Sequence, residues 1–582
     1  MTGPASRAVE APAGAPPRRR RLSADGAMIA MLVVVVGYVI LPPLVMLIYG
    51  AITDTGPAVD PNYTTDTLAR AYGRGTIYPA LGNSVLYAAC TATLVLVIGG
   101  FLAWLVERTD SSVRRYTDLF ALAPIVMPAV LLISGWILLL GPRNGLINLL
   151  AMEYLGAEGP LFDLFSFWGM VWVGMLQGAA VGFPVAVAGV SFHESRSRGG
   201  GTGGRGRDAD RAPAHHAADA QAHHIRRLDH LLHLLARPAH GAAADRVAGG
   251  HLPVLDRDLP RLPAHAHRPQ PGERIQPVVL AVTVAGIYAY RRATREADRF
   301  VTITGRGYNP RLIRLGKWQI VVTLVAVFLL LCVAGLPMLV LVWNAFMPYP
   351  QVPSLESLSL FTTRNFGRAL DYGPAVRAVG NSIVLGIAAG LVSTVIGALI
   401  AWANLRGRTH RRTIAVLDQL AMAPLAIPGI IIGVGLLWLY LVLPVPIYGT
   451  HWILLLAYVA IHLPFAVRIC TSGLAQLHPE LEEAGLVAGA SRATVLRRIV
   501  FLLIMPSILA SILYVGLRAF REYAASIFLS APGTEVFSVI VLDMWEGGNS
   551  NILSAYVTMV MVLLGVAMYG FFALSRRVGI KV

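Results

Sequence analysis

The residues with the most informative types and spacing lie in one polar stretch, 482–506, between two long apolar segments. Glu482 and Glu483 suit the first turn of a short helix, because the positive end of the helix dipole favours carboxylates there. Gly485 and Gly489 are four residues apart, so on a helix they present one face without side chains, which another surface can approach closely. A charged loop between membrane helices often only keeps that loop in the cytoplasm. The acidic pair followed by the two glycines instead predicts a docking surface.

The order of these residues resembles the EAA loop of bacterial ATP-binding-cassette (ABC) importer permeases, roughly E-A-A-x-x-x-G, nine residues, then I-x-L-P. Glu483, Ala484 and Gly485 take its first three places, Gly489 its glycine and Ile499 its isoleucine. Glycine stands at the third place of the motif, where the second alanine is usual, and the chain reads Phe-Leu where the family has Leu-Pro. The resemblance implies a coupling helix that sits in a cleft of a separate ATPase subunit and transmits its closure. The coupling residues that it implies are Glu482, Glu483, Ala484, Gly485, Gly489, Ala490 and Ser491.

No catalytic motif accompanies this loop. A phosphate-binding G-x-x-x-x-G-K-[ST] loop needs a lysine before Ser or Thr, and the only lysines are Lys317, which precedes Trp318, and Lys581. The cysteines, Cys90, Cys332 and Cys470, are too scattered for a disulfide framework or a zinc cluster. We therefore predict no catalytic residue, cofactor or metal ligand, and ATP hydrolysis by a partner.

Composition indicates a membrane protein. Hydrophobic residues make up 55% of the 582 residues and charged residues only 14%. The net charge of +16 could suggest nucleic acid as a partner, but the basic residues fall in loops between apolar runs, where membrane topology explains them. We expect no nucleic-acid partner and a multi-pass, all-α protein of the bacterial inner membrane, with both termini in the cytoplasm.

Apolar runs predict the membrane spans. Residues 1–26 are expected to be a disordered cytoplasmic N-terminus, and residues 27–51 an uncleaved helix, because this run is too long for a signal peptide. Residues 142–166 are expected to form an outer loop. Further spans are predicted at 83–106, 117–141, a fourth run ending near 192, 318–346, 379–404, 414–443, 451–474, 499–529 and 552–575.

An internal repeat indicates duplication. The segment from Asp118 to Pro124, followed by Pro128, recurs from Asp418 to Pro424, followed by Pro428. Prolines inside these helices are expected to kink them. The repeat predicts two tandem six-helix permease domains. Their bounds are 27–290 for the first, 291–317 for a cytoplasmic linker, and 318–582 for the second, which carries the loop at 480–506.

The first domain should carry its own coupling loop after its fourth helix. Residues 195–276 instead are rich in Arg, His, Ala, Gly and Pro, and eleven of the fifteen histidines lie between His193 and His267. A His-rich metal-binding loop and a disordered basic linker are two interpretations. A third is a frameshift: DNA that encodes Ser197 to Asp210 can, read one base later, encode LEAAARVAGAATR, which aligns with residues 481–490. We predict a frameshift near Ser195 that is restored around Pro277 and damages the first domain.

Three charged residues, Arg518, Arg521 and Glu522, follow the loop at 480–506. The first of them, Arg518, stands 19 residues after Ile499. Ionisable groups within membrane segments are often functional, which makes these candidate gate residues. We expect instead that Arg518 and Glu522 pair and snorkel at the outer surface. Asp543 and Glu546 are expected in an outer loop that faces a binding protein.

Two function classes follow. The favoured class is the fused permease subunit of an ABC importer, with two ATPase subunits, a periplasmic substrate-binding protein and the lipid bilayer as partners. The other is a secondary transporter with parallel six-helix repeats, which would need acidic residues inside its helices. The size, the duplicated domain and the join at Arg291–Tyr308 resemble ferric-iron permeases most, while related permeases carry thiamine, polyamines or phosphonates.

Overall fold

The computed structural model describes residues 24–53, 62–64, 77–112, 129–143, 145–192, 312–351, 356–407 and 410–577, with a few isolated positions between them. Within these residues the chain is helical, and its only extended pairings are the isolated bridges Thr53–Tyr63 and Thr109–Ile313. Six of the described helices are long and apolar enough to cross a membrane, or up to eight if each of two bent pairs counts as a span. The prediction of an all-α, polytopic membrane protein is confirmed.

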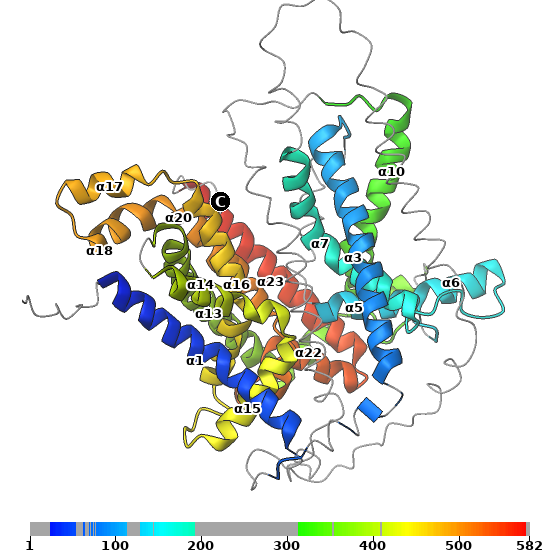
Figure 1. Ribbon diagram of the computed structural model, residues 1–582. Coiled ribbons are helices and arrows are strands. Elements are labelled where there is room, and N and C mark those ends of the chain that lie inside the picture. The colour runs from blue at the N-terminus through cyan, green and yellow to red at the C-terminus, as the bar shows by residue number, and fades with distance from the viewer. Residues whose placement is uncertain are drawn as a thin grey trace, which may run out of the picture. The chain divides into compact units, whose positions relative to one another are not determined.

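Among the described residues, the N-terminal part contributes five long or medium-length helices (Figure 1). These are α1 (Ala24–Ile52), α3 (Ile77–Arg108), α5 (Ala129–Leu140), α6 (Leu146–Leu155) and α7 (Phe167–Phe192). Helix α6 lies inside the segment 142–166, so the expectation of a plain loop there was wrong. Its side chains are good helix formers, Gly156 ends it with φ 68°, and the Asn148 side chain bonds to the backbone of Leu140, Gly141 and Phe162.

The C-terminal part begins with α10 (Gln319–Leu330) and α11 (Leu336–Phe346), which a π-helical turn joins into one span. The remaining elements are α12 (Arg364–Asp371), α13 (Gly373–Arg406), α14 (Arg411–Met422), α15 (Gly429–Val442), α16 (His451–Ala475), α17 (Glu480–Val487), α18 (Arg492–Val495), α19 (Phe501–Leu503), α20 (Met505–Phe520), α21 (Ser526–Leu529), α22 (Phe537–Glu546) and α23 (Ser550–Arg577). The predicted outer loop around Asp543 and Glu546 is therefore wrong, because both residues belong to α22.

Two predicted spans are broken. The segment 414–443 bends by 108° between Ala426 and Gly429, which confirms the kink expected at Pro424 and Pro428. The matching prolines of the first repeat lie outside the described residues. The segment 499–529 is not one helix, because the chain bends by 73° at Ile504 and α20 ends at Phe520. Pro506 has no backbone N–H to extend the preceding helix, so it starts a new one.

Helix α1, the first helix of the N-terminal repeat, packs on the C-terminal repeat. It contacts α14 and α15, where a Cβ on Gly435 would come within 2.5 Å of the backbone of Pro43. Reciprocally, α11 contacts α5, where a Cβ on Gly135 would come within 2.8 Å of the Pro337 side chain. Each glycine stands seven residues after a repeat proline, Pro128 or Pro428. The first helix of each repeat therefore packs against the same place in the other repeat.

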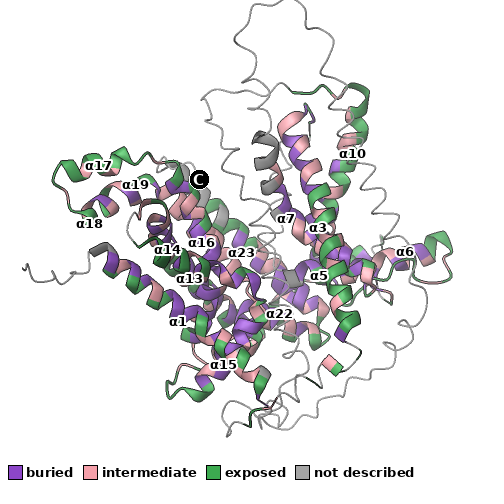
Figure 2. Cartoon of the chain, viewed as in Figure 1, coloured by how far each residue is buried: buried purple, intermediate pink, exposed green. Residues whose placement is uncertain are grey.

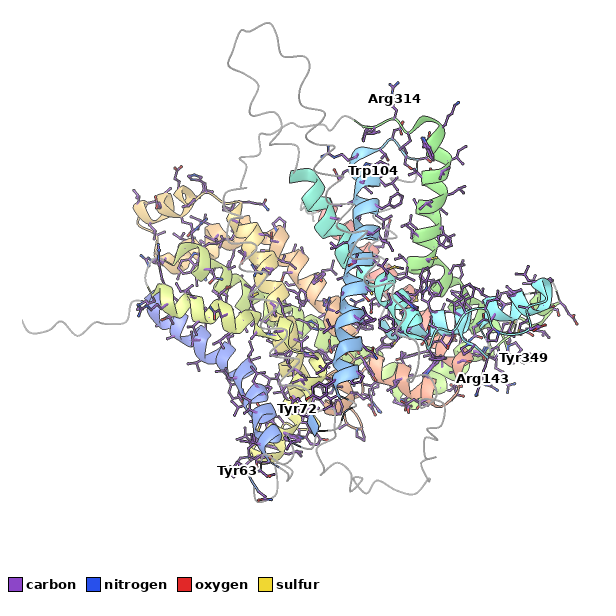
Figure 3. The ribbon with its side chains drawn as sticks, turned by 45° about the vertical axis from the view of Figure 1, so that its right-hand side comes forward. Tyr63, Tyr72, Trp104, Arg143, Arg314 and Tyr349 are labelled. Carbon is purple, nitrogen blue, oxygen red and sulfur yellow. The ribbon has the colours of Figure 1, made fainter. Side chains whose placement is uncertain are left out.

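Polar contacts show which helix ends lie together. The backbone of Arg108 and Asp110 bonds to that of Ile313, which joins the end of α3 to the chain entering α10. Figure 3 shows Trp104 and Arg314 at this end and Tyr349, which follows α11, beyond the other end of α10 and α11. There, Asn344 and Asn551 join the end of α11 to the start of α23. These contacts pair the end of α3 with the chain entering α10, and the end of α11 with the start of α23.

Candidate functional site

The predicted coupling segment forms two short helices beyond the end of α16 (Figure 1). Helix α17 begins after Pro479 and has Glu480, Glu482 and Glu483 in its first turn, so the predicted short helix is confirmed. Ser491 is the N-cap of α18, where its hydroxyl accepts a hydrogen bond from the Thr494 N–H at 3.2 Å. The segment thus has its own local folding signals.

The two glycines serve different purposes. Gly489 has φ +85°, a left-handed conformation in which the Ala490 N–H bonds to the Gly485 carbonyl and closes the end of α17. Gly485 instead permits close packing, because a Cβ there would lie 2.8 Å from Ile499 and 3.0 Å from Val495. The returning chain occupies the glycine face at Gly485, so this position packs within the loop.

Glu482 faces inward and holds α17 to the end of α13. Its carboxylate lies 2.7 Å from the Arg406 Nε and accepts a bond from the Trp402 indole at 3.2 Å. Arg406 also donates to the carbonyl of Leu477 at 2.7 Å. The side chains of Glu482 and Arg406 are only 14% and 16% exposed. We call this contact the α13–α17 latch.

The opposite face of α17 is exposed (Figure 2). It carries Glu483 and Ala484 from the motif, followed by Val487, and Val487 is 90% exposed. A large apolar side chain this exposed at the tip of a polar loop suits a partner surface. Of the predicted coupling residues, this face presents Glu483, Ala484 and Gly489, whereas Glu482 lies in the latch.

A second polar cluster lies inside the bundle, and sequence reasoning missed its centre. His462 is the twelfth of the 25 residues of α16, which spans about 37 Å at 1.5 Å per residue. It is 1% exposed, and its Nε2 lies 3.5 Å from Glu522, too far for a good hydrogen bond. Both ring nitrogens have no hydrogen-bond partner. The signal available in the sequence was a histidine in the middle of an apolar span, directly before Leu463-Pro464.

Backbone groups hold the Glu522 carboxylate in place. Its Oε1 accepts bonds from the N–H groups of Ala524 at 3.1 Å and Ala525 at 3.4 Å. A Cβ on Gly429, the first residue of α15, would come within 3.3 Å of the same oxygen. The N-terminal end of α15 thus faces this carboxylate, which the helix dipole favours.

Arg518 completes the cluster, and we call His462, Arg518 and Glu522 the mid-span cluster. The Arg518 guanidinium carbon lies 4.5 Å from the centre of the Phe465 ring, a cation–π distance. Since Phe465 is three residues from His462, these charges lie beside the middle of α16 rather than at the outer surface. The expectation that Arg518 and Glu522 form a pair at the outer surface is therefore corrected: Arg518 lies against the Phe465 ring, and Glu522 lies beside His462. Arg521 adjoins Glu522 and is partly buried.

Residues 393–579 match the family model described as a binding-protein-dependent transport system inner membrane component. They contain both the loop and the mid-span cluster. Residues 393–579 form a permease domain of a binding-protein-dependent ABC importer. The chain has several apolar helices and is a multi-pass membrane protein, and the match of residues 393–579 to an inner membrane component implies the inner membrane.

Several curated permeases align with parts of this chain. The ferric transport system permease FbpB of Actinobacillus pleuropneumoniae is 30% identical over 199 residues, which cover 34% of this chain and 28% of that protein. The putative 2-aminoethylphosphonate permease PhnV of Salmonella typhimurium is 26% identical, over 41% of this chain and 85% of that protein. The spermidine/putrescine permease PotC of Escherichia coli is 26% identical, over 35% and 75%.

A bacterial alginate ABC transporter, solved in complex with an alginate pentasaccharide-bound periplasmic protein, is 17% identical. The alignment covers 45% of this chain and 96% of the solved chain, with a TM-score of 0.35.

Proposed function

We propose that this chain is the fused, two-domain permease subunit of an ABC importer and that α17 is its coupling helix. The single observation that carries the proposal is the geometry of α17, whose inward face is tied to α13 while Val487 and its neighbours are exposed. Force applied to the exposed face would pass through the latch to a 34-residue helix that spans the membrane. The partners are two ATPase subunits in the cytoplasm and a periplasmic binding protein.

The reciprocal packing of α1 and α11 supports the proposal of two tandem domains, 27–290 and 318–582. A duplicated chain in which each first helix packs on the other repeat has two equivalent halves, and each would meet one ATPase. We retain 291–317 as the cytoplasmic linker, because the end of α3 and the chain entering α10 are bonded together. Both termini would then lie in the cytoplasm.

For the cargo we propose ferric iron. Two aligned relatives are ferric permeases, FbpB of Actinobacillus pleuropneumoniae and Fe(3+)-transport permease FbpB 2 of Haemophilus influenzae, at 30% and 23% identity. A phosphonate is the second candidate, because PhnV aligns over more of this chain. Uptake of radiolabelled iron or labelled 2-aminoethylphosphonate, each with its cognate binding protein, separates the two.

Docking is tested by replacing Val487 with Asp and measuring copurification of the ATPase subunit. We expect at least tenfold less ATPase, because a charge would lie in an apolar contact. The control is Leu358→Asp between α11 and α12, which is also exposed, at 48%, and lies outside the membrane-spanning helices. Equal ATPase recovery from the Val487→Asp variant would contradict the assignment of α17.

The position of Glu522 favours the secondary-transporter alternative, because a carboxylate lies beside the middle of a membrane span. In the ABC proposal the mid-span cluster is instead a gate that holds α16, α20 and the start of α15 together. Proteoliposomes that contain the permease, the ATPase and the binding protein distinguish these mechanisms. Uptake that needs ATP and survives an uncoupler supports the ABC importer, whereas uptake driven by a proton or sodium gradient alone supports the alternative.

We further propose that residues 195–276 derive from a frameshift, so that the chain as translated offers one coupling helix instead of two. This segment lies outside the described residues, and the proposal rests on the shifted reading frame alone. Resequencing the coding DNA tests it. A continuous frame, or stop codons in the shifted frame, would favour the His-rich linker. We expect the corrected DNA sequence to encode an uninterrupted first domain with a second coupling helix.

A further inference from the structure

A cavity of about 820 Å³ lies at the inner end of the C-terminal bundle. The end of α13, the starts of α1 and α14, the last third of α16 and the inner side of α17 line it. It contains the α13–α17 latch and reaches Glu483 at the edge of the exposed face of α17, but neither Val487 nor the mid-span cluster lines it. Nothing in the proposed transport function requires a cavity here.

The cavity has an apolar wall and a cationic rim. Ile29, Ile414 and Val467 lie in the wall and are buried. Arg411 and Arg468 lie at the rim, are exposed, and have no acidic partner within the described part of the chain. Both arginines line the same cavity, so each can contribute to the binding of an anion there.

Three acidic side chains line the cavity, Glu482, Glu483 and Asp418, and each already has an interaction of its own. The Glu482 carboxylate pairs with Arg406 at 2.7 Å, and Asp418 accepts a hydrogen bond from the Asn404 amide at 2.7 Å. Arg411 and Arg468 therefore remain as cations without a counter-charge. Guanidinium groups bind phosphate oxygens through paired hydrogen bonds, so the unmet chemistry is that of a phosphate-bearing anion.

We propose that this cavity binds an anionic phospholipid. The phosphate of the lipid would lie on Arg411 and Arg468, and the start of its acyl chains would lie along Ile29, Ile414 and Val467. The apolar wall favours a lipid over free phosphate, because a fully hydrated anion gains nothing from burial against isoleucine and valine. The site lies at the inner ends of spans, where basic pockets meet the anionic headgroups of the cytoplasmic leaflet. The α13–α17 latch lines the same cavity, so the lipid would also help to hold α17 in place.

The test measures lipid binding directly on the full-length chain in detergent, and it does not depend on transport. Native mass spectrometry would count phosphatidylglycerol retained by the wild type and by the double variant Arg411→Gln/Arg468→Gln. We expect at least a tenfold loss of the lipid-bound form. The matched control is Arg497→Gln/Arg498→Gln, which removes two exposed arginines of the coupling segment that do not line the cavity. It should bind like the wild type.

A second variant and a competitor keep the result decisive. Arg411→Lys/Arg468→Lys keeps both charges and should retain more lipid than the Gln pair, which a merely misfolded cavity would not do. Equal retention by the Gln pair and the wild type would overturn the proposal. Displacement of phosphatidylglycerol by millimolar inorganic phosphate would overturn the lipid assignment, because it would identify a site for the free anion.

Discussion

Glu482 and Glu522 are almost equally shielded from solvent, with 14% and 13% of their side chains exposed, yet they are partnered in opposite ways. Glu482 lies against a guanidinium and an indole N–H, so its charge is compensated inside the loop. Glu522 is held by backbone N–H groups and faces a histidine whose nitrogens lack partners. The first arrangement holds two helices together through a paired charge, whereas the second keeps the two unpartnered nitrogens of His462 inside the bundle.

This difference separates a structural carboxylate from a functional candidate. A latch needs its charges paired at every stage, because removing one partner leaves a shielded charge alone. A gate needs contacts that can be remade, and partly satisfied polar groups leave room for a second arrangement. The following predictions, from the largest expected effect to the smallest, test whether the two carboxylates differ in this way.

Glu482→Lys should have the largest effect on stability. It places a second cation beside Arg406, and disrupting a buried pair costs about 3–5 kcal/mol. We expect a lower unfolding temperature in detergent and loss of ATPase stimulation. Glu480→Lys is the matched control, because Glu480 lies in the same turn with its side chain 81% exposed. Recovery in the double variant Glu482→Arg/Arg406→Glu would confirm the pair, and an unchanged Glu482→Lys variant would contradict the latch.

Gly489→Val should have the second-largest effect. A β-branched residue at φ +85° is strained, by about 1–3 kcal/mol, although the space around it is open. We expect weaker coupling of ATP hydrolysis to uptake and faster proteolysis of the loop, with membrane insertion unchanged. The neighbouring Ala488 has φ −70°, so Ala488→Val introduces the same side chain without this strain. Equal proteolysis of the two variants would show that the left-handed turn is unimportant.

His462→Leu should separate stability from function. It removes two buried nitrogens without partners, which should raise stability by about 1 kcal/mol. Uptake should nevertheless fall if the mid-span cluster is a gate. Thermal unfolding and uptake are both measured, with His478→Leu as the control, since that side chain is 70% exposed. Increased stability with normal uptake would make the cluster a packing defect rather than a gate.

The smallest effect concerns Arg377 and Glu535, 3.4 Å apart on the outer side. Burial raises the pKa of Glu535, but bonds from backbone N–H groups and from Arg377 outweigh it, so the pKa is lowered overall. A lowered carboxyl pKa stabilises the fold above the unfolded-state pKa, and this stability is lost as the pH falls through the folded-state value. Arg377→Gln should therefore weaken the acid dependence of unfolding, by about 0.5 kcal/mol or less. An identical pH profile would show that the pair contributes nothing.

The sequence by itself determined the helical membrane fold, the broken span at Pro424 and Pro428, and the position of the loop. Each depends on local physics: apolar runs long enough to cross a bilayer, prolines that lack an N–H, and carboxylates in a first helical turn. The short helices α6, α12 and α22 were not predicted. Such elements depend on packing more than on a long apolar run, so they leave a weak periodic signal.

Only the tertiary structure decided what the named residues do. The motif places Glu482 and Glu483 side by side, but the position of Arg406, 76 residues earlier, makes Glu482 the inward residue. Counting residues from Ile499 placed Glu522 at the outer surface, because it assumed one straight helix. The 73° bend at Ile504 shortens the path, and Glu522 then lies beside His462 in the middle of α16. A local sequence pattern fixes which residues are charged, whereas contacts between distant segments fix which of those charges are paired, buried or exposed.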